Sequence, residues 1–255
     1  MPEALTKPFA LTVFLLAVAP FIGSFLGTLV LRLPTGAPVV AARSACAQCG
    51  HRLGVAELLP LLSYALQRGR CRHCAARLPP FYPAIELAAL SIVLWAMSQT
   101  SGPVLLLTCL LGWALLPLAL IDRQHFLLPD ALTLPLLAIG LLGTAWLDPE
   151  GLPDHALGAA IGYTAFAAIS LGYRRLRGRD GLGWGDVKLL AACGAWLSWA
   201  GLPAVVLLAS ALGLVEALAR RLRGAGPATE ERIALGTWLC AALWLGWLYG
   251  PLLAE

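Results

Sequence analysis

Residues 103–147 read PVLLLTCLLGWALLPLALIDRQHFLLPDALTLPLLAIGLLGTAWL, and this stretch indicates the fold more directly than any other. Two long apolar runs, 103–121 and 131–147, flank a short polar connection that contains Asp122, Arg123 and Asp130. The hydrocarbon core of a bilayer takes roughly 20 apolar residues of helix, so each run is expected to cross a membrane. Neither run alternates between polar and apolar residues as the strands of an outer-membrane barrel do, so the spans are predicted to be helices.

The composition of the whole chain agrees with this interpretation. Hydrophobic residues make up 59% of the 255 residues, charged residues make up 13%, and the mean hydropathy is +0.79. Soluble domains carry about twice that charged fraction, so soluble globular and disordered classes are excluded. Seven cysteines in a chain of this length are too few for a disulfide-rich secreted scaffold.

We therefore predict an all-α membrane protein, a polytopic bundle of about eight transmembrane helices. The predicted spans are 9–31, 84–99, 103–121, 131–147, 156–173, 187–201, 203–219 and 233–250. Only one long polar segment interrupts them. We accordingly divide the chain into a first transmembrane helix at 1–31, a cysteine-containing loop at 32–83 and a transmembrane bundle at 84–255.

The basic residues predict the orientation of the chain in the membrane. Of the 18 Lys and Arg, all but Lys7 fall in alternate connections between the spans, while the other connections hold acidic residues only. Cytoplasmic loops are the ones enriched in Lys and Arg, so these four basic connections are predicted to be cytoplasmic and both termini external. The net charge of +4 is then a topology signal in a protein of the lipid bilayer, and no nucleic-acid partner is expected.

The loop at 32–83 contains two Cys-x-x-Cys pairs, Cys46 with Cys49 and Cys71 with Cys74. Two such pairs are typical of a structural zinc site, because each supplies two thiolates along one edge of a tetrahedron. A cytoplasmic location argues against disulfides. We predict that the four cysteines bind one Zn²⁺ and staple a loop too small to form its own core. The alternatives are that His73 replaces one ligand or that the cysteines bind no metal.

Two aspartates at membrane edges are candidates for catalysis, because an ionisable group there is costly unless it has a function. Asp122 ends one predicted span, and Asp186 opens another within Gly183-Trp184-Gly185-Asp186-Val187-Lys188. The two glycines are expected to allow close approach and unusual dihedrals before Asp186. Two carboxylates that share a proton would activate water against a peptide carbonyl. Alternatively, Asp130 and Asp186 cap helices, Lys188 snorkels, and Asp122 pairs with Arg123.

Taken together, the motifs resemble those of the bacterial type IV prepilin leader peptidase/N-methyltransferase family. The resemblance extends over about residues 21–200 and combines many short motifs in one order. They are Gly23-Ser24-Phe25-Leu26, Arg32-Leu33-Pro34, the two cysteine pairs, Tyr82-Pro83-Ala84-Ile85-Glu86, Asp122 with Leu127-Leu128-Pro129-Asp130, and the segment from Gly183 to Lys188.

The resemblance implies a membrane aspartyl endopeptidase of the GxGD type with Asp122 and Asp186 as its catalytic residues. Gly183, Gly185, Lys188 and Asp130 would belong to the supporting motif. Such an enzyme removes the basic leader of prepilins or pseudopilins after a glycine, on the cytoplasmic side of the bacterial inner membrane. Methylation of the new N-terminus by S-adenosylmethionine is expected to follow, and Glu86 is a candidate participant in it.

Other interpretations of the same sequence stay open. Asp130 is the alternative to Asp122 as a catalytic residue, and the alternative for Glu86 is a purely structural role. The protein could be a peptidase without methylation, or an inactive membrane scaffold whose zinc loop docks a partner. A transporter is less consistent with the sequence, because no inverted repeat is evident and the aspartates lie at a membrane edge.

Overall fold

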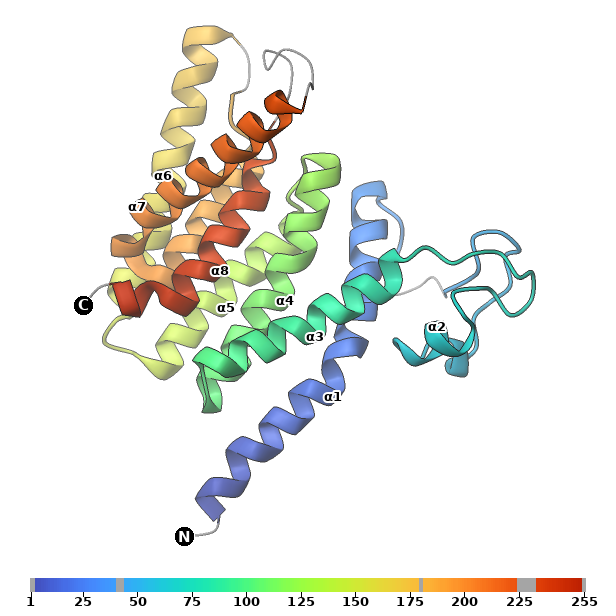
Figure 1. Cartoon of the computed structure of the whole chain (residues 1–255). Coiled ribbons are helices and arrows are strands. Elements are labelled where there is room, and N and C mark those ends of the chain that lie inside the picture. The colour runs from blue at the N-terminus through green and yellow to red at the C-terminus, as the bar shows by residue number, and fades with distance from the viewer. Residues whose placement is uncertain (1–2, 40–43, 179–180, 224–232, 254–255) are drawn as a thin grey trace. The chain divides into compact units, whose positions relative to one another are not determined.

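The computed structural model describes residues 3–39, 44–178, 181–223 and 233–253, and these residues form helices joined by turns. The chain divides into two compact units, Met1–Pro117 and Leu118–Glu255, with the boundary inside helix α4, Gly102–His125. The predicted all-helical class is confirmed (Figure 1).

In the N-terminal unit, helix α1, Glu3–Arg32, packs against helix α3, Phe81–Gln99. Two glycines one turn apart on α1 make the contact close. A Cβ at Gly23 would lie 2.6 Å from the Cα of Glu86, and one at Gly27 would lie 3.2 Å from Ile85. Small residues allow helix backbones to approach closely inside membranes, and the Gly23 motif found in the sequence therefore has a packing role.

The polar segment between α1 and α3 contains only short elements. They are two 3₁₀ helices, η1 at Leu33–Thr35 and η2 at Val55–Glu57, and helix α2 at Leu62–Leu66. The segment has little regular structure to hold it together, so its fold depends on the turns around the cysteines and on any metal that they bind.

The C-terminal unit contains the end of α4 and helices α5, Asp130–Leu147, α6, Leu152–Arg177, α7, Trp184–Leu222, and α8, Leu235–Leu253. Among the helices of this unit, α6 and α7 pack most closely. A Cβ at Gly158 or Gly162 on α6 would lie within 2.7 Å of backbone atoms of α7, and one at Gly194 on α7 would lie 2.2 Å from Gly158. Backbone therefore packs on backbone along this interface.

Helix α7 is two helices joined at a reversal, as Figure 1 shows. Ser198 has φ 59° and ψ −179°, which no α-helix contains. Both ends of α7 lie near the end of α4, since Asp186 interacts electrostatically with Asp122 and Glu216 pairs with Arg123. A straight helix from 186 to 216 would be about 45 Å long, so only a reversal at Ser198 brings both ends there.

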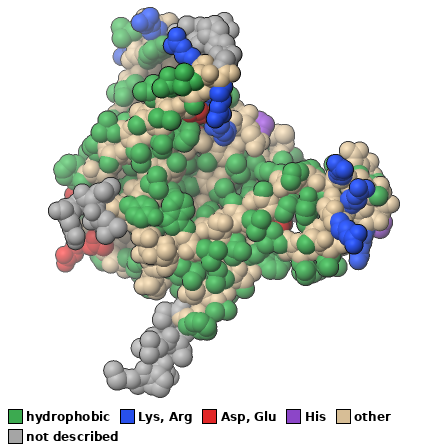
Figure 2. All heavy atoms as spheres, in the orientation of Figure 1, with side chains coloured by type: hydrophobic (Ala, Val, Ile, Leu, Met, Phe, Trp, Pro, Cys, Tyr) green, Lys and Arg blue, Asp and Glu red, His purple; other side chains and the backbone are tan. Residues whose placement is uncertain are grey.

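This reversal explains why two predicted spans lie within one helix of the structure. Six helices in the described part of the chain are long and apolar enough to cross a membrane, namely α1 and α3 to α7, and α8 contains a shorter apolar helix, Leu235–Gly250. The predicted spans 187–201 and 203–219 both lie within α7, on either side of Ser198. Hydrophobic side chains cover the helices in Figure 2, whereas Lys and Arg gather on the cysteine segment and at one end of the C-terminal unit.

Candidate functional site

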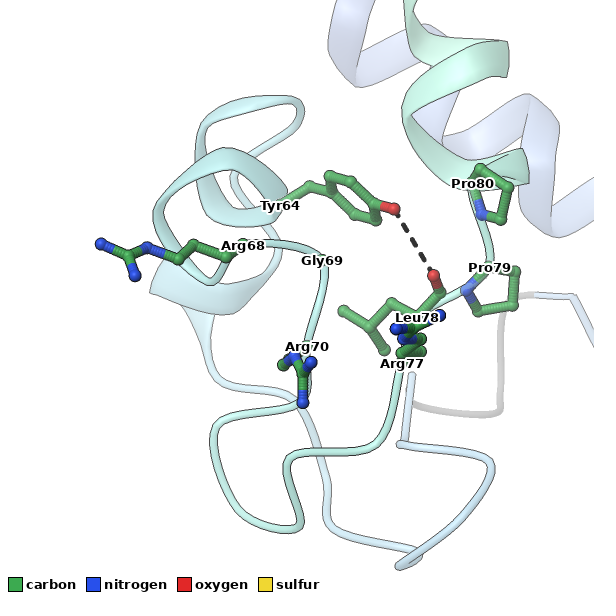
Figure 3. Close-up of a pocket in the computed structure, with 8 residues that line it drawn as sticks. All are labelled: Tyr64, Arg68, Gly69, Arg70, Arg77, Leu78, Pro79 and Pro80. Carbon is green, nitrogen blue, oxygen red and sulfur yellow. Dashed lines mark hydrogen bonds between the residues drawn. The ribbon is translucent and has the colours of Figure 1, made fainter.

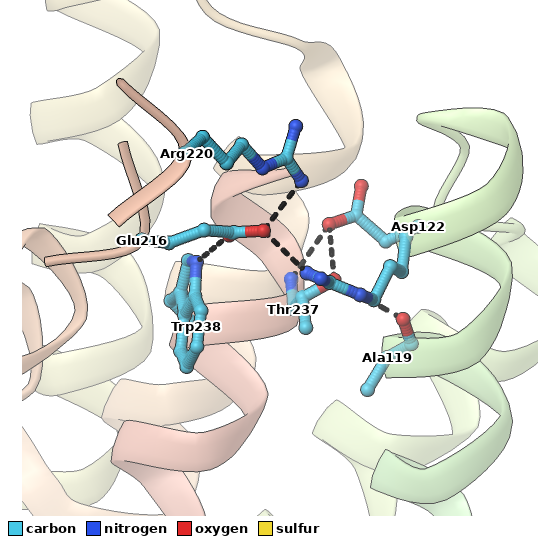
Figure 4. Close-up of polar contacts among 7 residues, drawn as sticks. Ala119, Asp122, Glu216, Arg220, Thr237 and Trp238 are labelled. Carbon is cyan, nitrogen blue, oxygen red and sulfur yellow. Dashed lines mark hydrogen bonds and ion pairs between the residues drawn. The ribbon is translucent and has the colours of Figure 1, made fainter. Parts of the chain in front are cut away.

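Asp122 lies in the last turn of α4 and is only 5% exposed. Its Oδ2 accepts a hydrogen bond of 2.6 Å from the backbone N–H of Thr237 at the start of α8. The Thr237 hydroxyl lies 3.0 Å from the same oxygen and 3.1 Å from the carbonyl oxygen of Ala119, so its one proton has two possible acceptors (Figure 4). Asp122 is thus held by α8 through one oxygen. The suggested pairing of Asp122 with Arg123 is wrong, because Arg123 binds Glu216 instead.

Asp186 lies in the first turn of α7 and faces the same region. The two carboxylates are near enough to interact electrostatically, although 64 residues separate them in the sequence. The Oδ1 atom of Asp186 is buried and has no hydrogen-bond partner among the described residues. A buried carboxylate oxygen without a partner is costly, so it is available for a water molecule or a substrate group.

The glycines before Asp186 provide room rather than unusual backbone geometry. Gly183 has an ordinary extended conformation with φ −71° and ψ 142°, and Gly185 does not have positive φ, so the predicted unusual dihedrals are wrong. A Cβ at Gly185 would lie 2.7 Å from the Cβ of Leu128, and one at Gly183 would lie 3.2 Å from a carboxylate oxygen of Asp186. The predicted close approach is therefore present at both glycines.

Leu128 joins the parts of the site that carry the two aspartates. It is 6% exposed and lies against Gly185 of α7 and Gly236 of α8. A Cβ at Gly236 would lie 2.8 Å from Leu128 and 3.0 Å from Cγ of Asp122. The absence of a side chain at Gly236 thus leaves space for the Asp122 carboxylate.

A second carboxylate network holds α8 and the ends of α4 and α7 together. Glu216 of α7 accepts hydrogen bonds from Arg123, Arg220 and the indole N–H of Trp238, at 2.8, 2.5 and 2.7 Å (Figure 4). Arg123 follows Asp122 in the chain, and Trp238 follows Thr237. Two of the donors to Glu216 are therefore the chain neighbours of the residues in the Asp122–Thr237 contact. Thr237 was not identified from the sequence, and Glu216 was assigned no role. The one sequence signal for these two residues is that each is a polar residue within an apolar segment.

Asp130 and Lys188 form an ion pair outside this cluster. The Lys188 Nζ lies 2.6 and 2.7 Å from the two oxygens of Asp130. Helix α5 begins at Asp130 but its N-cap residue is Pro129, so the predicted cap role of Asp130 is wrong. Asp186 is likewise not the N-cap of α7, which is Gly183; its carboxylate instead accepts a hydrogen bond from the Gly183 backbone. The Asp130 side chain is 55% exposed and bound to a cation, which suits it less to catalysis than Asp122.

The four predicted zinc ligands lie together in the cysteine segment. The sulfur atoms of Cys46, Cys49, Cys71 and Cys74 are all within 4.8 Å of one another, and those of Cys46 and Cys74 are 3.8 Å apart. Tetrahedral zinc with bonds of about 2.3 Å separates its sulfurs by about 3.8 Å, so the cluster fits zinc. Hydrogen bonds from the backbone of Cys49 and Gln48 lower the pKa of the Cys46 thiol to about 6, which favours the thiolate that a metal requires.

The two cysteine pairs are copies of one turn, displaced by 25 residues. In the first, Cys46 N–H donates to the His51 carbonyl and Gly50 N–H donates to the Cys46 carbonyl; the bonds from Cys71 to Ala76 and from Ala75 to Cys71 repeat this. Bridges at Ala45–Arg52 and Arg70–Arg77 flank the turns with the same displacement. Two equivalent turns thus present two thiols each.

Glu86 has a structural partner on each side. It is 6% exposed, and its Oε2 accepts a 2.7 Å hydrogen bond from the backbone N–H of Leu61, which has the strained φ of 59°. Ser24 of α1 also hydrogen-bonds the carboxylate. Glu86 therefore ties the cysteine segment and α1 to α3, and this contact accounts for a carboxylate inside an apolar helix.

A pocket of about 570 Å³ opens in the same unit beside the start of α3 (Figure 3). Its lining comes from α2, from the strand-like part of the second cysteine turn and from the residues before α3; it consists of Tyr64, Arg68, Gly69, Arg70, Arg77, Leu78, Pro79 and Pro80. Three arginines suit the pocket to an anionic group. A sulfonium ion, which is positive, would be repelled there.

Each of the two units matches a known protein family. Residues 109–218 match the model of the type IV leader peptidase family, and residues 17–100 match the bacterial peptidase A24 N-terminal domain. Similar proteins named prepilin leader peptidase/N-methyltransferase include one from Burkholderia pseudomallei, 40% identical over 89% of this chain and 82% of that protein. Relatives of the same name from Aeromonas salmonicida and Pseudomonas putida are 41% and 38% identical, over 82% and 90% of this chain and 72% and 87% of theirs. No solved structure matches the chain.

Proposed function

Because this chain belongs to the type IV leader peptidase family, we propose that it cleaves the basic leader from prepilins or pseudopilins and then methylates the new N-terminus. The observation that carries the peptidase assignment is the approach of two carboxylates from different helices, the buried Asp122 and the half-buried Asp186. The first family model includes both residues.

The two aspartates have different surroundings, which suits a division of roles. We assign Asp122, whose Oδ2 accepts the Thr237 N–H, and Asp186, whose Oδ1 has no partner within the described residues, to a dyad that shares one proton. The ionised carboxylate takes a proton from water while the oxygen of that water attacks the carbonyl carbon of the leader glycine. The protonated carboxyl gives its proton to the carbonyl oxygen, which yields a gem-diol. As the C–N bond breaks, the amide nitrogen takes the proton that was removed from water, and a gem-diol hydroxyl returns its proton to the dyad.

The supporting motif has a positioning role in this scheme. Gly185 lets the start of α7 approach Leu128, and Gly183 leaves room beside the Asp186 carboxylate. The Asp130–Lys188 pair holds the starts of α5 and α7 together. A groove between helices of the bundle would take the apolar helix of the substrate, with its basic leader in the cytoplasm. The alternation of Lys and Arg among the connections supports this orientation, and we propose the bacterial inner membrane as the location of the enzyme.

For the cysteine segment we propose one structural zinc bound by Cys46, Cys49, Cys71 and Cys74. The support is the 3.8 Å separation of two of the sulfurs and the common geometry of the two turns. Four thiolates would leave no open coordination position, so zinc would stabilise the segment at 32–83 rather than take part in the reaction. The predicted division into 1–31, 32–83 and 84–255 is retained as part of this proposal.

Methyl transfer is assigned to the N-terminal unit, with S-adenosylmethionine as the donor. Glu86 is the carboxylate of that unit best placed to attract a cation, because it is buried and near α1, α3 and the cysteine segment. The donor's sulfonium and the new α-amine are both cations, so they suit Glu86 better than the arginine pocket.

The test is to incubate the purified protein in detergent with a prepilin and S-adenosylmethionine and to measure the masses of the products by mass spectrometry. Cleavage with one added methyl group is expected from the wild type. Asp122→Asn and Asp186→Asn should each lose about a thousandfold in cleavage rate, and Asp148→Asn, in the turn after α5, is the matched control. Wild-type rates in either dyad variant would refute the assignment, and a cleaved product without methyl would limit the enzyme to proteolysis.

A further inference from the structure

Beside the cysteine cluster, a second group of ligand side chains converges. The side chains of His51, Glu57 and His73 place their ligand atoms within 4.8 Å of one another. His51 ends the first cysteine turn, His73 lies inside the second, and Glu57 ends η2. The group thus joins the two cysteine turns to η2.

The Glu57 carboxylate is the observation that points to a ligand. Its Oε2 accepts the backbone N–H of Gly54 at 2.8 Å, while its Oε1 is buried and unpartnered within the described part of the chain. The whole side chain is only 9% exposed. An oxygen in such a position normally has a hydrogen-bond donor, a water molecule or an ion next to it.

The distance across the gap is too long for a hydrogen bond and suits a bridging cation. Oε1 of Glu57 lies 3.9 Å from Nε2 of His73. A divalent metal with bonds of about 2.1 Å to each atom would separate them by about 3.4 Å at a tetrahedral angle and about 4.2 Å in a line. The observed separation lies between these values.

The imidazole rings of His51 and His73 lie against each other. Their ring centroids are 3.4 Å apart and their planes are tilted by 30°, so each ring restricts the other. Both histidines are exposed, which leaves a path for a metal from solvent, while the carboxylate is anchored by Gly54. Two imidazoles and one carboxylate are ligands that zinc and neighbouring divalent transition metals accept.

We infer that His51, Glu57 and His73 form a second metal site, distinct from the four cysteines, for a divalent transition metal such as Zn²⁺, Co²⁺ or Ni²⁺. Bound there, the metal would link both cysteine turns to η2 and leave at least one coordination position open. The inference is independent of the proposed peptidase chemistry, because none of the three residues belongs to the aspartate site.

Cobalt distinguishes the two sites in one titration of the full chain. The protein is purified in detergent, freed of metal under reducing conditions and titrated with Co²⁺. Cobalt bound by thiolates absorbs strongly by sulfur-to-metal charge transfer, whereas cobalt bound by imidazole and carboxylate does not. Wild-type protein should bind two equivalents by elemental analysis, of which only one raises the thiolate band.

The variants Glu57→Gln and His73→Gln should each bind one equivalent and keep the full thiolate band. His125→Gln, which changes a histidine at the end of α4, is the matched control and should still bind two. The proposal is overturned if the wild type stops at one equivalent or if both variants still bind two. It is also overturned if both variants lose the thiolate band, because the three residues would then serve the cysteine site itself.

Discussion

The space at Gly236 can be tested directly, because a single methyl group placed there must press on the Asp122 carboxylate. The Cβ of Gly236→Ala would lie 3.0 Å from Cγ of Asp122 and 2.8 Å from Cδ1 of Leu128. Carbon atoms normally contact at about 3.5–4.0 Å, so the carboxylate would have to move by about 0.5 Å or more. The leucine end is flexible and yields more easily than a carboxylate held by Thr237.

The expected cost follows from that displacement. A misplacement of about 1 Å at a catalytic group costs about a hundredfold in rate, so about 0.5 Å should cost about tenfold, or about 1.4 kcal/mol in activation free energy. The measurement is kcat/KM for leader cleavage by the purified protein, with the thermal midpoint as a check on folding.

Gly172→Ala is the matched control, because a Cβ at Gly172 on α6 meets nothing within 4 Å. It should keep the wild-type rate. A folded Gly236→Ala protein that cleaves within twofold of the wild type would refute the reasoning, since the Asp122 carboxylate would then not need its present position.

Three further predictions concern other contacts. Thr237→Val keeps the backbone N–H to Asp122 but removes the hydroxyl, and kcat for cleavage should fall by about three- to tenfold; an unchanged kcat would assign that hydroxyl to Ala119 alone. Asp130→Asn breaks an exposed pair with Lys188 and should lower the free energy of unfolding by less than about 1 kcal/mol, measured in denaturant titrations, while cleavage stays within about fivefold. Removal of metal by a chelator should make residues 44–78 sensitive to an added protease, which mass spectrometry of the fragments would show, while the protein continues to cleave prepilin leaders. Equal resistance to the protease with and without metal would contradict a structural zinc.

Local features of the chain could be predicted from its sequence. Long apolar runs inside a bilayer form helices, since no water is present there to satisfy the backbone, and the described chain is helical in these runs apart from Ser198 and residues 233–234. The cysteine cluster follows for a similar reason. Each Cys-x-x-Cys turn is made by hydrogen bonds between residues at most five apart, so its geometry is local.

The two predicted spans 187–201 and 203–219 imply that the chain turns back between them, but not that it does so at Ser198. Gly201 and Pro203 lie where the two apolar segments meet, whereas the φ of 59° occurs three residues before Gly201, at Ser198. Treating the segments as separate spans gave nearly the right helix boundaries but not the contact of Glu216 with Arg123.

The site itself depends on contacts between residues far apart in the sequence. Asp122 and Asp186 were identified by their motifs, but a motif does not give the distance between two carboxylates, and Thr237, 115 residues after Asp122, has no motif at all. Sequence pattern and composition reflect the conformation that each segment prefers by itself in water or lipid. The meeting of α4, α7 and α8 arises from side-chain packing and long-range hydrogen bonds, which have no counterpart in any single segment.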